Sequence, residues 1–488
     1  MNGTDFRAQW RNSRAVRERI FIQGTLVLET PAHFGNGDAD SVTDIPLLRD
    51  PFAGRALLTG SSIAGALRNY AREQELGFGE AEKRDGATFA EKLFGHLKLL
   101  TEQARRKRED AEEEAVESWL MVDDALGAMP QTELRDGVKL DARTRTAEDK
   151  KKFDVELLQA GTTFPLAFEL WVSEGAAGLV DTLALALRGF ERGEIRLGKR
   201  KQRGYGQCRV SAWTVRRYDM TTHADLLGWL NNDATGAETG AEIVKLLGVT
   251  NTRADARACF TMRACFGLEG SLLIRSSAGE VGAPDFVHLR SHRNGESKPI
   301  LSGTSAAGAI RARALRIANT LELLDAEGLI EGMFGKGETE GKTRAESKPR
   351  GSRVLVRETV IDPALADRVQ SRVKIDRFTG GAFPRGLFSE QPVFGLPATR
   401  VQIELELKNP KEREVGLLLL VLKDLWTGDL PLGGESAVGR GRLRGEQAEL
   451  ELGSERWTLE ETKEGLNAQG NRQRLEDMVD ALRRGDGK

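Results

Sequence analysis

The chain has 488 residues, of which 39% are hydrophobic and 30% are charged, a composition that suits two or three soluble globular domains. It has no apolar run of 18 residues, and its N-terminus lacks the apolar stretch of a signal peptide, so we expect a cytoplasmic protein without a membrane partner. The net charge of −2 argues only weakly against nucleic acid, because local basic clusters can override the total. The cysteines and histidines are too few and scattered for a disulfide framework or a dedicated metal cage.

An internal repeat is the strongest organising feature of the sequence. Four motifs occur twice, in one order and at nearly one spacing: GSSIAGALR (60–68) and GTSAAGAIR (303–311), KLFG (92–95) and GMFG (332–335), VKLD (138–141) and VKID (373–376), LG (197–198) and LG (432–433). In the first pair, six of nine positions are identical. We therefore interpret the chain as a duplicated unit.

The repeat divides the chain into two units, a connector and a tail. We expect the first unit at 16–217, a helical connector at 218–257, the second unit at 258–455 and a helical tail at 456–488. Each unit opens with an alternating strand, continues into the Gly-Ser helix, and ends with an apolar helix and a last strand. This order, β-α-β-β-α-β with antiparallel pairing, predicts an α+β fold of two tandem ferredoxin-like domains.

The helices that begin at the Gly-Ser motif are candidate anion-binding sites. Ser61 and Ser62 precede an apolar helical face, and a simple helix cap would already explain them. A helix N-terminus also presents free N–H groups and the positive end of the helix dipole to a phosphate. Gly65 and Gly308 lie inside these helices at a cost of about 1 kcal/mol each relative to Ala, which favours close approach of a ligand or another backbone.

The glycine-rich loop RLGKRKQRGYG (196–206) is the most basic segment of interest. It carries five cations and no anion, and it lacks the spacing of a phosphate-binding P-loop. Its cations, its flexible backbone and Tyr205 are typical of a loop that binds phosphates and stacks a base. The counterpart in the second unit offers only Arg440 and Arg442, so we expect the first unit to bind an RNA backbone more strongly.

Two aspartates occupy matching positions ahead of the Gly-Ser helices. Asp44 precedes IPLLRD and Asp285 precedes FVHLRS, whereas His33 and His288 lie on opposite sides of their aspartates. The reactive group that the two units share is therefore a carboxylate alone. Such a carboxylate could stabilise a turn, hold a divalent cation, or accept a proton from a ribose 2′-hydroxyl.

The order of these motifs resembles the RAMP superfamily of CRISPR proteins, and most of all the backbone subunits of type III effector complexes. The most specific piece is VKIDRFTGGAFPRGLFSEQPVFG (373–395), and both halves match, as in fused type III-D-like proteins. The resemblance implies that each RNA-recognition-like unit grips a CRISPR guide RNA and assembles with other effector subunits. It also implies protruding thumb hairpins at about 138–160 and 373–396, although the first lacks the RFTGGA sequence of the second.

The same resemblance implies an RNA-guided, metal-dependent endoribonuclease of antiviral defence. Asp44 and Asp285 would each bind a divalent cation, Mg²⁺ or Mn²⁺, and cleave complementary target RNA beside a nucleotide flipped by the thumb. The residues expected to bind RNA are hydroxyl or basic side chains of the repeated motifs: Ser61, Ser62, Arg68, Lys139, Arg143, Lys199, Arg200, Arg203, Ser305, Arg311, Lys374, Arg377 and Arg440.

Two alternatives stay open. The chain could be a non-catalytic scaffold that binds guide RNA and neighbouring subunits, or it could be a nuclease that processes the guide RNA. Guide processing often relies on histidine or tyrosine as the acid or base, and the two halves share no such residue.

Overall fold

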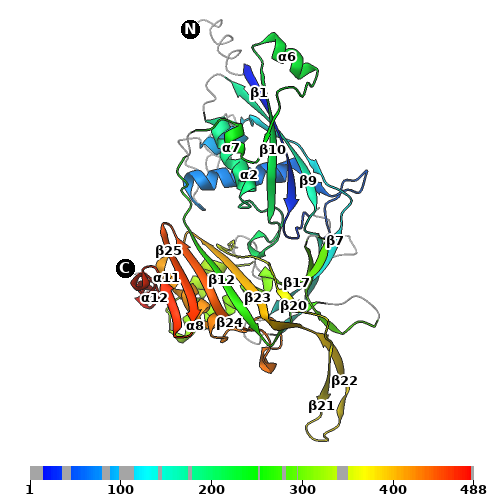
Figure 1. The fold of residues 1–488 in the computed structure, drawn as a ribbon, viewed down its shortest axis with the longest axis vertical. Helices are drawn as coiled ribbons and strands as arrows, with labels where there is room; N and C mark the ends of the chain where they lie inside the picture. The colour runs from blue at the N-terminus through cyan, green and yellow to red at the C-terminus, as the bar shows by residue number, and fades with distance from the viewer. Residues whose placement is uncertain are drawn as a thin grey trace, which may run out of the picture.

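The computed structural model describes residues 15–35, 46–79, 88–97, 115–140, 146–173, 178–250, 253–276, 282–293, 295–337 and 350–484. It contains two α+β units, each with its own antiparallel sheet and its own hydrophobic core. Figure 1 shows the two sheets as separate bodies, with strand β1 of the first unit above strand β12 of the second.

The first unit is built on the sheet β11-β10-β1-β9-β5. Its strands are β1 (Val16–Leu28), β5 (Leu120–Val122), β9 (Thr163–Ser173), β10 (Cys208–Asp219) and β11 (Glu238–Gly240). Buried and more exposed residues alternate along β9, because successive side chains of a strand point to opposite faces. The helices α2 (Gly60–Leu76) and α5 (Leu179–Glu191) contact each other and supply buried residues to the same core.

The second unit repeats this arrangement. Its strands are β12 (Cys259–Glu269), β18 (Val354–Val356), β23 (Val393–Lys408) and β24 (Arg442–Leu452), and its helices are α8 (Gly303–Thr320) and α11 (Glu412–Trp426). The sheet order β24-β12-β23-β18 corresponds to β10-β1-β9-β5 in the first unit, with antiparallel neighbours throughout. In both sheets, the two strands joined by each βαβ crossover lie on either side of another strand. This arrangement confirms the predicted ferredoxin-like fold.

Shorter elements connect these strands and helices. They are β2 (Leu57–Leu58), α3 (Phe89–Phe94), β3 (His96–Leu97), β4 (Ala115–Val116), β6 (Ala125–Leu126), η1 (Lys201–Arg203), α6 (His223–Leu230), α7 (Ile243–Leu246), β13 (Ser271–Leu272), β14 (Arg275–Ser276), β15 (Phe286–His288), β16 (Arg290–Arg293), β17 (Glu296–Leu301), α9 (Ala326–Phe334), β19 (Thr359–Val360), β20 (Asp362–Leu365) and η2 (Ser436–Val438).

The connector and the tail contain more strand than the sequence predicts. Within 218–257, β11 pairs with β10, so part of the expected helical connector extends the first sheet. Within 456–488, β25 (Glu455–Thr462) and β26 (Gly465–Gln469) extend the second sheet ahead of helix α12 (Arg472–Arg484). Burial alternates at Trp457 and Leu459, which is the period of a strand and not of a helix.

Each unit carries a long antiparallel hairpin. Strand β7 (Thr132–Leu140) pairs with β8 (Ala147–Leu158), and β21 (Gln370–Ile375) pairs with β22 (Ala382–Gln391). The second hairpin projects from the body of the protein as an extended arm (Figure 1). Both hairpins begin ahead of the positions predicted for the thumbs, because residues before VKLD and VKID already pair in register.

His288 of β15 is a buried structural residue. Its Nδ1 accepts a hydrogen bond from the Ile274 N–H at 3.2 Å, and its Nε2 donates to the Ile300 carbonyl at 2.9 Å. Burial lowers the pKa of His288 to about 4, because a charged ring would lose its hydration. The ring is therefore neutral at physiological pH.

We expect this buried ring to make the protein less stable as the pH falls from 6.5 toward 4. The unfolded chain protonates His288 below about pH 6.5 and the folded protein only near pH 4, so the unfolded state binds more protons in this window. The pKa shift corresponds to a decrease of about 3 kcal/mol in the free energy of unfolding at the acidic end of this window. Urea unfolding at the two ends of the window should show a smaller loss for His288→Gln than for wild type. The exposed His223→Gln should behave like wild type, and an equal loss in all three proteins would contradict the assignment.

Candidate nucleic-acid interface

The basic loop of the first unit packs against the second unit. Its turn η1 is flanked by Arg200 and Gly204, both in the left-handed backbone region. A Cβ atom on Gly204 would lie 2.5 Å from the backbone nitrogen of Glu358, and one on Gly303 would lie 2.5 Å from the carbonyl oxygen of Arg203. Glycine is therefore needed on both sides of the contact, since any side chain there would separate the two backbones.

Cations from both units meet at this contact. Desolvation of its guanidinium and the positive charges of Arg200 and Arg311 lower the pKa of Arg203. Lys199 and Arg200 also lower the pKa of His33, to which burial makes the larger contribution. Among the residues that the structure describes, none of these four cations forms an ion pair with a carboxylate. The fold thus brings together four residues that the sequence predicts to bind RNA.

A buried ion-pair network fixes the two units on either side of the loop. Arg135 of β7 donates two hydrogen bonds to the Glu358 carboxylate, one of them between Nη2 and Oε1 at 3.0 Å, and Arg293 pairs with the same carboxylate. Burial opposes ionisation of Glu358, but the two arginines outweigh it and lower its pKa. Arg196 of the first unit adds a pair with Glu406 of the second at 3.0 Å.

Two residues predicted to face RNA are buried instead. Tyr205 is 4% exposed, and the guanidinium carbon of Arg135 lies 5.4 Å from the centre of its ring. Arg440 is 2% exposed, and its Nη2 donates to Glu390 and to Gln370, each at 2.9 Å. The structure therefore corrects both predictions, because these side chains stabilise the loops that carry them and are not presented to a ligand.

A hydroxyl side chain one residue before each repeated helix provides its cap. Thr59 accepts a hydrogen bond from the Ser62 N–H, and Ser302 accepts one from the Ser305 N–H, each at 3.3 Å. Ser61 and Ser62 are exposed and Ser305 is half-buried. The two serines of α2 are thus not needed as caps, contrary to the simple explanation for them, and their hydroxyl groups lie at the surface.

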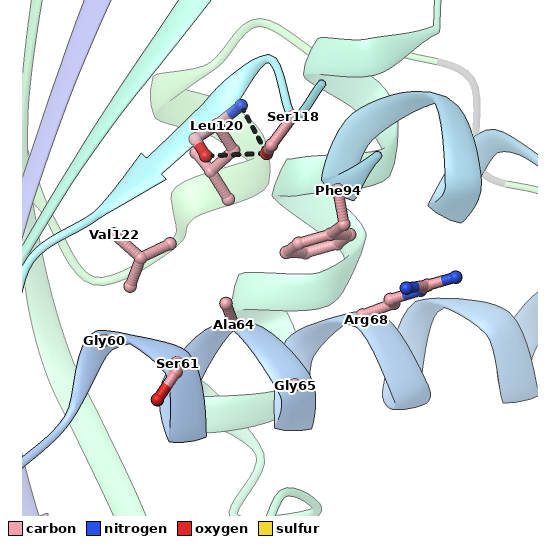
Figure 2. A pocket seen from close by; sticks show the side chains of 9 residues that line it. All are labelled: Gly60, Ser61, Ala64, Gly65, Arg68, Phe94, Ser118, Leu120 and Val122. Carbon is pink, nitrogen blue, oxygen red and sulfur yellow. Dashed lines mark hydrogen bonds between the residues drawn. The ribbon is translucent and has the colours of Figure 1, made fainter. Parts of the chain in front are cut away.

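A cavity of about 340 Å³ lies beside the start of α2 (Figure 2). Phe94 and Val122 contribute apolar walls, and Ser61, Gly65 and Arg68 line the helical side. A Cβ atom on Gly65 would meet no other atom within 4 Å, and the same holds for its counterpart in α8, so these glycines leave open space. The close backbone approach expected at them occurs instead at the first residue of each helix.

The second thumb hairpin presents both of its predicted RNA-binding residues to solvent. Lys374 and Arg377 are exposed, and the Lys374 ammonium lies 4.6 Å from the centre of the Phe383 ring. Asp376 accepts hydrogen bonds from the backbone of the following turn and so fixes the tip of the hairpin. Of the matching residues in the first thumb, the Lys139 side chain and the whole of Arg143 lie outside the described part of the chain.

Asp285 lies exposed at the base of the second thumb. Its Oδ2 accepts hydrogen bonds from the Ser389 N–H at 2.7 Å and from the Ser389 hydroxyl at 3.2 Å. Strand β22, which forms one side of the thumb, therefore positions this carboxylate. The matching residue of the first unit, Asp44, lies outside the described residues.

The described residues do not by themselves form a complete metal site. Within the ranges given above, no three histidine, cysteine, aspartate or glutamate side chains gather where they could hold one ion. His33 and His288 are buried and contact backbone carbonyl groups. A cation at Asp285 would need further ligands, and phosphate oxygens are the partners that Mg²⁺ commonly takes beside one or two carboxylates.

Two duplicated ferredoxin-like units with projecting hairpins and a cationic junction define a class of RNA-binding protein. A family model of the RAMP superfamily matches residues 25–209 and 280–444, one match in each unit and together more than half of the chain. The chain therefore belongs to the RAMP superfamily, as two fused units, and is a CRISPR-associated RNA-binding protein. A search of curated proteins found no relative. No described helix has the length and apolar character needed to cross a membrane.

Sequence analysis missed the residues that join the two units. Arg135 and Glu358 are 223 residues apart, and Arg196 and Glu406 are 210 residues apart. Such pairs leave no local pattern, because each member is an ordinary charged residue in a strand or a loop. Only the position of each carboxylate beside an arginine of the other unit identifies them.

We expect Glu358→Ala to destabilise the protein by about 3 kcal/mol, because Arg293 would lose the carboxylate it pairs with and Arg135 would keep only Glu133. Urea unfolding measures the loss. A matched control is Glu476→Ala, which breaks the exposed pair with Arg472 and should change stability by less than about 1 kcal/mol. Equal stability of the two variants would show that the buried network does not hold the units together.

Proposed function

We propose that this protein is a guide-RNA-binding backbone subunit of a type III CRISPR effector complex, in which its two units hold successive parts of one guide. The observation that supports this most directly is the cluster of Arg200, Arg203 and Arg311, which comes from both units and has no carboxylate partner among the described residues. Cations that repel one another at a fixed junction are stabilised by an anion, and a backbone phosphate supplies one.

The thumb suits contact with a guide–target duplex. On the second hairpin, the large apolar side chains Phe378, Leu387 and Ile375 are exposed, with Phe378 99% accessible. Apolar side chains that enter between base steps unstack them and kink a duplex. Complementary target RNA and other type III effector subunits would be the partners of such an assembly.

The RNA contact can be tested with the double variant Arg203→Ala/Arg311→Ala. We expect its affinity for a fluorescent oligouridine to fall by roughly tenfold or more at moderate salt, and the slope of log affinity against log salt to decrease by about 0.7 for each phosphate that the variant no longer binds. Fluorescence anisotropy over a salt series measures both. The exposed Arg456→Ala of β25 should change neither. An unchanged salt slope in the double variant would place the RNA elsewhere.

We further infer that Asp44 and Asp285 cleave the target RNA with Mg²⁺ or Mn²⁺. The position of Asp285 supports this, because Ser389 of the thumb strand holds its Oδ2 while the carboxylate stays exposed. A phosphate backbone bent at the base of the thumb would pass this carboxylate. A divalent cation held jointly by the carboxylate and the RNA would stabilise charge at the scissile phosphate.

Asp285→Asn should remove one of two product bands from a guide-bound complex supplied with complementary RNA, and Asp44→Asn the other. The amide oxygen introduced by Asp285→Asn can still accept the hydrogen bond from Ser389, so the loss reports the charge and not the fold. We expect the affected cut to slow by on the order of a hundredfold or more. The exposed Asp367→Asn, ahead of β21, is the matched control. Both bands persisting in both variants would refute the assignment.

A non-catalytic scaffold is the second candidate, and the isolation of Asp285 favours it. Within the described residues this carboxylate belongs to no group of three side chains able to hold a metal, and Ser389 already occupies one of its oxygens. A denaturing gel of the guide-bound complex with complementary RNA, with and without EDTA, separates the two candidates. Intact target RNA in both lanes supports the scaffold, and cleavage that EDTA abolishes contradicts it.

A further inference from the structure

Helix α6, in the connector between the two units, presents an apolar face to solvent. The helix begins after Thr222, whose hydroxyl oxygen accepts a hydrogen bond from the Asp225 N–H at 3.2 Å. All of its eight residues are exposed or half-buried, and Leu227 and Leu230 are 45% and 63% exposed. Ala224, Leu227 and Leu230 follow one another at a spacing of three and so lie along one side of the helix. We call this side the α6 face.

The opposite side of α6 is fixed to the first sheet. The ring centre of Trp229 lies 4.3 Å from the guanidinium carbon of Arg19 in β1, and Arg19 pairs with Glu169 of β9 at 2.6 Å. After the helix, the Asp233 carbonyl accepts a hydrogen bond from the Tyr218 hydroxyl at 2.9 Å. The helix is therefore held against the sheet by its Trp229 side, and the α6 face points away as a docking surface.

The surroundings of the α6 face are acidic. Residues 219–242 carry five carboxylates and no lysine or arginine. Asp219, Asp233 and Glu238 are exposed, and Asp225 lies half-buried in the helix itself. An apolar face bordered by carboxylates fits an occupant that combines aromatic or aliphatic side chains with cations.

We propose that the occupant of the α6 face is the segment before β1, residues 1–14 of this chain, MNGTDFRAQWRNSR, which lies outside the described residues. Its composition matches the face, since it carries three arginines against one aspartate and two large aromatic residues, Phe6 and Trp10. The aromatic side chains would cover Leu227 and Leu230, and the arginines would face the carboxylates. The inference goes beyond the proposed function and does not depend on RNA.

The place where this segment joins the fold favours the same occupant. The Arg17 carbonyl, at the start of β1, accepts a hydrogen bond from the Met220 N–H at 2.8 Å, and α6 begins at His223. Figure 1 shows α6 at the same end of the first unit as the start of β1. Fourteen extended residues span up to about 45 Å, whereas an eight-residue helix is about 12 Å long, so the segment can reach the whole α6 face.

The covalent link also makes a weak contact sufficient. A short tether gives an effective concentration on the order of 1 mM, so a contact with a Kd of about 0.1 mM would be about nine-tenths occupied. A separate protein at micromolar concentration would need a larger surface than one face of a short helix to reach the same occupancy. The tethered segment is therefore a better occupant than an independent partner.

Amide hydrogen exchange of the full chain, without RNA, tests this contact. Docking of residues 1–14 protects the amides of α6, so we expect Phe6→Ser/Trp10→Ser to speed their exchange by about tenfold. The charge variant Arg7→Glu/Arg11→Glu should speed it by at least about threefold, because it places carboxylates against an acidic surface. Amides of β9 should exchange at the wild-type rate in both variants, which would show that the fold is intact.

The matched control is Asn2→Ser/Asn12→Ser, which changes polar residues of the same segment and should leave exchange in α6 unchanged. The wild-type rate should also be independent of protein concentration, because the contact lies within one chain. Amides of α6 that exchange at the same rate in wild type and in Phe6→Ser/Trp10→Ser would overturn the proposal. Protection that increases with protein concentration would identify a second copy as the occupant and overturn it as well.

Discussion

The arrangement of this protein depends on a contact between backbones, the one between the basic loop of the first unit and the start of α8. The four cations at 199–203 repel one another, so their side chains alone would not hold the loop on another domain. Gly204 and Gly303 remove the side chains from the point of contact, and Glu358, held between Arg135 and Arg293, supplies negative charge behind it. The loop is thereby fixed while Lys199, Arg200 and Arg203 stay without carboxylate partners among the described residues.

The two units keep one loop geometry but give it different chemistry. Arg200 and Glu435 hold the same left-handed position at the start of their turns. In the second unit Glu435 and Arg440 join Glu390 of the thumb strand β22 in a buried cluster, so that loop is tied to its own thumb. Ser389, the neighbour of Glu390, positions Asp285. Loop, thumb and aspartate of the second unit therefore form one connected structure, whereas the first loop is devoted to the junction.

This division suggests how an RNA-binding subunit can be built by duplication. The family membership establishes the RNA-binding role, and in the proposed function the junction would hold an RNA backbone at a fixed point between the two units. Binding an RNA backbone in this way would require cations held in a fixed arrangement, which the loop of the first unit could provide. Any chemistry on a target would require a carboxylate placed against a bent backbone, which the base of the second thumb could provide.

Local patterns in the sequence were sufficient for the duplication, the ferredoxin-like order of strands and helices and the basic character of residues 196–206, because each of these follows from periodicity, turn chemistry or composition. The thumb hairpins were expected only from the resemblance to the family. Local patterns could not identify Thr59 and not Ser61 as the helix cap, since either hydroxyl side chain can cap a helix. Only the tertiary structure decided that Tyr205 and Arg440 are buried and that Arg203 meets Arg311 across the two units. Burial and long-range ion pairing depend on partners far away along the chain, and such partners leave no imprint on the sequence around a residue.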